Sequence, residues 1–157
     1  MTEVKLLPRT CDSCHKCCDG WLYGSAHGKD FYPGKPCHYL TSGKGCGIYD
    51  QRPEVPCKSY TCEWLTNLEI PNWVKPNMSD VIITKRKIET HDYWDVIECG
   101  KKMDSSVLNW LMLHAINNST NMVYRVDGGM NFLGTTEFIE AYRQFMDPKQ
   151  NVADVKL

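Results

Sequence analysis

Hydrophobic and polar residues follow regular patterns in the C-terminal part of the chain but not in the N-terminal part. Residues 80–89 (DVIITKRKIE) and 93–99 (YWDVIEC) are rich in β-branched and aromatic residues, which predicts two strands. The short polar segment 90–92 between them predicts a hairpin turn. Residues 122–126 (MVYRV) predict a third strand, and a turn follows at 127–129.

The same part of the chain predicts two helices. After Asp104 or Ser105, either of which can cap a helix, apolar residues recur at spacings of three and four. A second helix is predicted over 137–146, where Pro148 closes it, and we expect residues 149–157 to form a frayed tail. These elements predict an α+β protein with a small antiparallel sheet and two helices.

The N-terminal part has a different character. Glycine and proline are frequent in residues 20–56, which disfavours long helices and predicts loops and turns. A loop-rich segment of this size buries too little apolar surface to hold itself together, so it needs cross-links such as thiolate–metal bonds. We therefore predict a cysteine-coordinated module over 1–62, packed on an α+β part over 63–157 with which it forms one compact unit.

The cysteines supply the candidate ligands, because eight of the nine fall between residues 11 and 62. Three of them, at intervals of three residues, begin the N-terminal run Cys11-x2-Cys14-x2-Cys17-Cys18. Bacterial ferredoxins use such a run, completed by a remote cysteine, to hold iron–sulfur clusters of the [4Fe–4S] type. Zinc sites more often take two ligands from each of two turns. The candidate metal ligands are Cys11, Cys14, Cys17, Cys18, Cys37, Cys46, Cys57 and Cys62.

Counting ligands leaves several alternatives open. Eight thiols could serve two four-ligand sites, or one site with several structural thiols. Cys17 and Cys18 are adjacent, so we do not expect both to bind the same metal atom. His15 and His38 lie beside candidate cysteines and could replace a thiolate, or could be exposed or outer-sphere residues. Cys99 stands alone in an apolar strand and is expected in the core.

The cysteine run resembles the signature of the CxxCxxCC proteins, the YkgJ-like cysteine-cluster family. A second motif of that family resembles three segments here, which occur in the right order: Pro36-Cys37-His-Tyr-Leu40, Cys46-Gly-Ile-Tyr-Asp-Gln-Arg52-Pro53 and Cys57-Lys-Ser-Tyr60. The resemblance covers residues 11–62 and implies a domain that chelates zinc or iron. Larger relatives such as flagellin lysine methylase carry this domain beside an enzymatic activity.

One departure from the family pattern concerns Cys57. The family places two residues between the Arg-Pro pair and the next cysteine, whereas this chain has three, so the loop must absorb one more residue. Whether Cys57 or Cys62 completes the site stays open. Arg52 could offset the negative charge of the thiolates as an outer-sphere cofactor-binding residue, or could be a turn residue in a surface ion pair.

Charge and hydropathy limit the partners. The net charge of −1 gives no reason to expect a nucleic-acid or acidic membrane partner. We also find no apolar run long enough to span a membrane, and the first ten residues lack the apolar core of a secretory signal, so we expect a cytoplasmic protein. Thiols are kept reduced in that compartment, which favours metal or redox chemistry over disulfides.

These observations lead to three hypotheses for function. The first is an iron–sulfur protein in an electron-transfer or redox accessory role, with a protein redox partner. The second is a zinc protein in which the metal is structural and the C-terminal half binds a partner. The third is an enzyme that uses the cluster or metal directly. No sequence motif identifies a catalytic residue, and the oligomeric state is not predicted.

Overall fold

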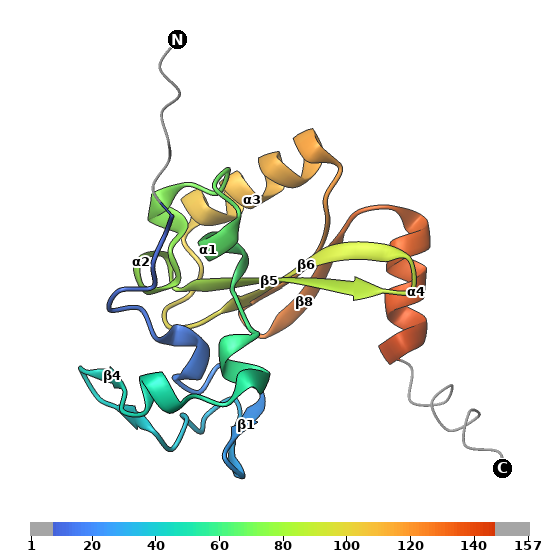
Figure 1. The fold of residues 1–157 in the computed structure, drawn as a ribbon. Coiled ribbons are helices and arrows are strands. Elements are labelled where there is room, and N and C mark those ends of the chain that lie inside the picture. Colours follow the sequence, from blue (N-terminus) through green and yellow to red (C-terminus); the bar gives the residue numbers. More distant parts are fainter. Residues whose placement is uncertain (1–7, 147–157) are drawn as a thin grey trace, which may run out of the picture. The chain divides into compact units, whose positions relative to one another are not determined.

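The computed structural model describes residues 8–146, which form two compact units (Figure 1). The first unit ends at Ile82 and the second begins at Ile83, so the division falls inside strand β5 (Val81–Ile88). The predicted boundary at residue 62 lies earlier in the chain. Both units combine helices with strands, and the chain is an α+β protein, as the sequence predicts.

The first unit consists of short elements joined by loops. Two small antiparallel hairpins lie within it, formed by β1 (Gly24–Ala26) with β2 (Lys29–Phe31) and by β3 (Leu40–Thr41) with β4 (Gly45–Cys46). The helical elements are single turns: η1 (Lys16–Cys18), η2 (Tyr49–Gln51), η3 (Glu54–Lys58), α1 (Glu63–Thr66), η4 (Asn72–Val74) and α2 (Pro76–Ser79). None of these elements is long enough to produce a recognisable hydrophobic period, which is why the sequence predicted only loops here.

A small apolar cluster lies beneath the first hairpin. Its buried members are Ala26, Phe31 and Cys37, against which the partly buried side chains of Cys18 and Cys57, among others, pack. The ring of Phe31 lies over its cross-strand partner Gly24, where an added Cβ would come within 2.2 Å of the ring. A glycine is therefore required at residue 24, and cysteine side chains form part of the hydrophobic packing of this unit.

The second unit is built on a four-stranded sheet in the order β5-β6-β7-β8. β6 (His91–Glu98) pairs in parallel with β7 (Asn121–Val126), and β7 pairs antiparallel with β8 (Gly129–Leu133). Helix α3 (Ser105–Asn118) makes the crossover between the two parallel strands. The sequence predicted a small antiparallel sheet of three strands, and it predicted neither the parallel pair nor β8.

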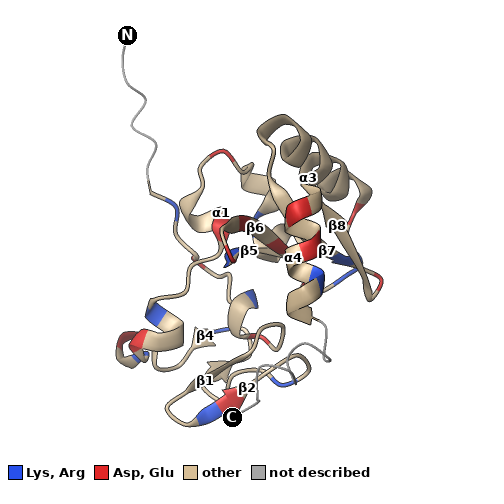
Figure 2. Cartoon of the chain, turned by 90° about the vertical axis from the view of Figure 1, so that its right-hand side faces the viewer, with Lys and Arg blue, Asp and Glu red and all other residues tan. Residues whose placement is uncertain are grey.

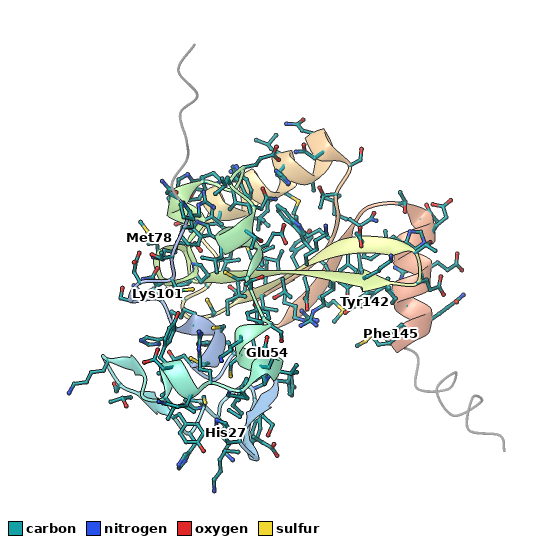
Figure 3. All side chains as sticks on the ribbon, viewed as in Figure 1. His27, Glu54, Met78, Lys101, Tyr142 and Phe145 are labelled. Carbon is teal, nitrogen blue, oxygen red and sulfur yellow. The ribbon has the colours of Figure 1, made fainter. Side chains whose placement is uncertain are left out.

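The two long helices cover opposite faces of this sheet. Tyr93 of β6 packs against Phe138 and Tyr142 of α4 (Thr136–Met146), with Tyr142 on the sheet side of that helix (Figure 3). The next residue, Trp94, stacks instead on His114 of α3, with ring centroids 4.5 Å apart. Since adjacent strand residues point to opposite faces, α3 and α4 lie on different sides of the sheet.

Helix α3 begins, and helix α4 ends, at the predicted position. The carboxylate of Asp104 accepts a 2.8 Å hydrogen bond from the backbone N–H of Ser106 and caps α3. α4 ends at Met146, and its predicted closure at Pro148 and the tail over 149–157 lie outside the described residues. α3 contains no charged residue (Figure 2), and in the described part of the chain no helix is both long and apolar enough to cross a membrane.

Replacing Phe138 with alanine should destabilise the second unit by about 3–5 kcal/mol, because its side chain is fully buried between α4 and the sheet. Phe145→Ala is the matched control on the same helix, since Phe145 is 62% exposed and its loss should change stability by no more than about 0.5 kcal/mol. Urea unfolding followed by tryptophan fluorescence measures both. Equal losses for the two variants would show that α4 does not pack on the sheet as described.

Candidate metal centre

Two consecutive turns hold the first three cysteines of the N-terminal run. The backbone N–H of Cys14 donates to the carbonyl of Cys11 at 2.8 Å, and η1 follows immediately with Cys17 and Cys18 in its only turn. Turns closed over three residues repeat side-chain positions every third residue. Local backbone geometry therefore accounts for the grouping of Cys11, Cys14 and Cys17.

Cys62 joins this group from a distant part of the sequence. Burial, followed by the charges of the Cys11, Cys17 and Cys14 thiolates, raises the pKa of the Cys62 thiol to about 11. The pKa of Cys11 is raised in the same way, first by burial and then by Cys17 and Cys14. The charges of Cys14 and Cys17 thus act on both Cys11 and Cys62, and we call these four side chains the first cysteine set: Cys11, Cys14, Cys17 and Cys62.

Arg9 ties the two ends of this set together. It lies two residues before Cys11, and its guanidinium donates to three backbone carbonyls after Cys62, those of Trp64 at 2.6 Å, Asn67 at 3.0 Å and Ile70 at 2.5 Å. The guanidinium also stacks over the Trp64 ring, 4.6 Å from its centroid. The N-terminal run is thereby anchored to the segment that begins at Cys62. The sequence analysis did not identify Arg9, whose only signal was its nearness to Cys11.

The second cysteine set contains Cys37, Cys46 and Cys57. Cys37 is buried and Cys57 packs against the same apolar cluster, while Cys46 lies in β4 opposite Leu40. Burial, followed by the charges of Cys37 and Cys46 and then that of Cys17 in the first set, raises the pKa of the Cys57 thiol. Figure 3 shows sulfur atoms in yellow among the loops of this unit, where His27 and Glu54 are labelled.

The extra residue before Cys57 is absorbed by a wide turn. In η3 the backbone N–H groups of Lys58 and Ser59 bond to the carbonyls of Pro53 and Glu54, each five residues back, at 3.2 and 2.8 Å. Such a turn accommodates one residue more than an α-helical turn. Cys57 consequently remains near Cys37 and Cys46, and Cys62 belongs to the other set.

The side chains of the adjacent cysteines Cys17 and Cys18 lie close to each other. A hydrogen bond to Cys18, followed by burial, raises the pKa of the Cys17 thiol. The Cys18 thiol donates to the carbonyl of His15 at 3.2 Å and packs on the apolar cluster beneath the first hairpin. That Cys17 and Cys18 do not bind the same metal atom stays a prediction, and we assign Cys17 to the first set.

Arg52 acts on both sets through its charge. Its guanidinium lies 3.7 Å from the centroid of the Tyr49 ring and donates to the Tyr49 carbonyl at 2.8 Å. From this position Arg52 opposes the increase in pKa of both Cys11 and Cys57. Arg52 therefore places a positive charge within range of a thiol in each set, and its role as an outer-sphere residue of a cofactor stays a prediction.

The remaining candidates have different surroundings. Cys99 is fully buried, as the sequence predicts, and lies in the second unit. His38 packs edge-on against Tyr39, with ring centroids 5.0 Å apart. Nδ1 of His15 is shielded from solvent and has no hydrogen-bond partner among the described residues.

The donor chemistry of the two sets fits a soft metal or an iron–sulfur cluster, because all seven side chains are thiols and none forms a disulfide. Their spacing is more open than in a closed site: among residues 8–146, no three His, Cys, Asp or Glu side chains converge closely enough to hold a metal ion. The thiols must lose their protons before a metal can bind. The raised pKa values therefore describe the protonated thiols in this open arrangement.

Comparisons of this chain with protein-family models, curated proteins and solved structures find no match. The resemblance to the CxxCxxCC proteins therefore stays a prediction from the two cysteine motifs. Any assignment of function has to follow from the residues themselves and from the way the structure groups them.

Replacing Arg9 with methionine should destabilise the first unit by about 2 kcal/mol, because three hydrogen bonds from a charged donor are lost while the apolar stem is kept. It should also speed alkylation of Cys62, which is partly buried and follows the run that Arg9 anchors. Urea unfolding and the rate of Cys62 modification by iodoacetamide measure the two effects. The control is Lys44→Met, a loss of charge at an exposed turn, which should change neither quantity. Unchanged reactivity of Cys62 in Arg9→Met would contradict the anchoring role.

Proposed function

We propose that this protein is an iron–sulfur protein in which the first cysteine set holds the cluster and which transfers electrons as a redox accessory component. The observation that carries the proposal is the grouping of Cys62 with the triple run. Arg9, two residues before Cys11, supports this grouping through its hydrogen bond to the backbone carbonyl of Trp64, just after Cys62. A C-x2-C-x2-C run completed by a remote cysteine is the ligand pattern of a [4Fe–4S] cluster.

The residues around the first set suit a redox role. A cluster, when bound, would accept and release single electrons, and four thiolates would give its surroundings negative charge. Arg52 and Lys75 both oppose the increase in pKa of Cys11, so both place positive charge near the set. Cations at this position would favour the reduced form and raise the reduction potential. A protein redox partner is the expected source or acceptor of the electrons.

A structural zinc protein is the second candidate, and the second cysteine set favours it. Cys37 precedes the β3–β4 hairpin and Cys46 lies in it, an arrangement typical of zinc ligands at a turn between strands. In this alternative the metal holds the loops together and the second unit binds a partner. The two candidates differ both in the metal and in the cysteine set that favours each.

The carboxylate of Asp95 in β6 is engaged in ion pairs within the second unit. Asp95 accepts hydrogen bonds from Arg86 at 3.0 Å and from Arg125 at 2.5 Å, and its side chain is 15% exposed. Asp95 is thus held in an ion-pair network with two guanidinium groups. The proposal therefore places the chemistry in the first unit.

Replacing Cys14 with serine should reduce the iron and acid-labile sulfide content of anaerobically prepared protein to well under half, because a ligand in the middle of the first set is lost. Cys99→Ser is the control in the second unit and should leave both contents unchanged. Iron and sulfide assays with visible absorption measure the effect. Full iron content in Cys14→Ser would show that the triple run is not the ligand core.

A further inference from the structure

The sheet of the second unit has two edges that differ in charge. Among residues 8–146, no strand pairs with the outer side of β5 or with the outer side of β8. β5 carries Lys85, Arg86 and Lys87, all exposed, and such charges on an edge strand oppose pairing with another chain. β8 contains neither a charged residue nor a proline. The edge at β8 is therefore open to a further strand, whereas the edge at β5 is protected.

The turn before β8 determines which backbone groups face this open edge. Asp127-Gly128 is a two-residue turn in which both residues have positive φ, as is usual for such hairpins. The residues that flank a two-residue turn bond to each other through both backbone groups, so Gly129 and every second residue after it bond to β7. Met130 and Phe132 lie between these positions, and their backbone N–H and C=O groups are directed outward.

The side chains of β8 match a second copy of the same strand. Met130 and Asn131 are exposed, and Phe132 is partly buried. In an antiparallel pair centred on Asn131, Met130 of each copy lies opposite Phe132 of the other, and the two asparagines lie opposite each other. A thioether beside an aromatic ring is a favourable contact, and two amides can exchange hydrogen bonds. This register also joins the outward backbone groups of Met130 to those of Phe132 in the other copy.

Helix α4 carries complementary charges beside this edge. The guanidinium of Arg143 lies 5.9 Å from the ring centroid of Phe132. Glu140 is exposed one turn earlier, and both residues line the same pocket. A two-fold axis at Asn131, perpendicular to the sheet, brings Glu140 of each copy toward Arg143 of the other. Because this pairing of charges is self-complementary, it favours a second copy over an unrelated strand.

We propose that β8 is the interface of a homodimer, in which two copies pair antiparallel about Asn131 and join their sheets into one. The interface consists of one short strand and part of one helix, so the dimer is weak and dissociates in the micromolar range. This surface lies in the second unit and requires no metal. The inference therefore goes beyond the proposed function, and its failure would leave the cluster proposal unaffected.

The register is tested by amide hydrogen exchange of the full-length chain, measured by NMR at concentrations where sedimentation finds the monomer and where it finds the dimer. Dimerisation should slow the exchange of the Met130 and Phe132 amides at least about tenfold, because they become hydrogen-bonded. The Asn131 amide, already bonded to β7, and the amides of 85–87 at the other edge should change little. A monomer at every concentration, or a dimer in which Met130 and Phe132 exchange as in the monomer, would overturn the proposal.

Two substitutions of Met130 test the edge itself. Met130→Pro removes an outward N–H but none of the bonds to β7, so the dissociation constant of the dimer should rise at least about tenfold. Met130→Lys keeps every backbone group, and it should weaken the dimer by giving β8 the kind of charge that β5 has. The matched control is Met78→Lys at an exposed residue of α2, which should dimerise as the wild type does. Sedimentation equilibrium measures the affinities, and circular dichroism checks the fold. Unchanged affinity in both Met130 variants would show that the dimer forms elsewhere.

Glu140→Arg and Arg143→Glu test whether the occupant is a second copy. Each variant alone places like charges opposite each other at two positions, and its self-association should be several-fold weaker than that of the wild type. An equimolar mixture of the two variants should form a heterodimer, because every Arg then lies opposite a Glu. A mixture that associates no better than either variant would contradict the two-fold arrangement about Asn131.

Discussion

The grouping of cysteines from both ends of the first unit depends on the interaction of Arg9 with the backbone after Cys62. A planar guanidinium that donates to three carbonyls and stacks on Trp64 fixes two chain segments with one side chain. The loops between these segments contain only short elements and a small apolar cluster, which could not hold the ends together by burial alone. The position of Arg9, two residues before Cys11, thus determines which remote cysteine joins the triple run.

Electrostatics supports the proposal that this arrangement binds a metal. Thiols that are partly buried near one another resist ionisation, because each thiolate formed raises the pKa of its neighbours. Arg52 and Lys75 relieve this repulsion only in part, and a divalent metal or a cluster would relieve it fully.

The sequence predicted what depends on local patterns and missed what depends on tertiary contacts. Helix α3 and the strands around it were predicted because their period or composition is clear over six or more residues. The parallel pairing of β6 with β7 was not, since an isolated strand gives no sign of its neighbour's direction. β8, with its exposed residues and two polar or flexible positions, carried too weak a pattern.

In the candidate site, too, the sequence predicted what depends on local spacing and missed what depends on tertiary contacts. All eight candidate cysteines were recognised from their spacing, and Cys99 was correctly assigned to the core. Their partition into two sets could not be derived from spacing, because Cys57 and Cys62 are near in sequence but feel mainly different cysteines: Cys57 feels chiefly Cys37 and Cys46, Cys62 feels Cys11 and Cys14, and both feel Cys17. Nδ1 of His15, which has no hydrogen-bond partner among the described residues, is shielded by tertiary packing that brings the ring near the distant Gly45, and no sequence pattern could have revealed it.

The central claim is that the first cysteine set binds an iron–sulfur cluster. Mössbauer spectroscopy of the wild-type chain, reconstituted anaerobically with ⁵⁷Fe and sulfide, tests it most directly. The account predicts the spectrum of a cluster with iron sites ligated by thiolate sulfur, and equal amounts of iron and acid-labile sulfide. A colourless protein that takes up zinc in both cysteine sets and retains no iron after reconstitution would contradict it.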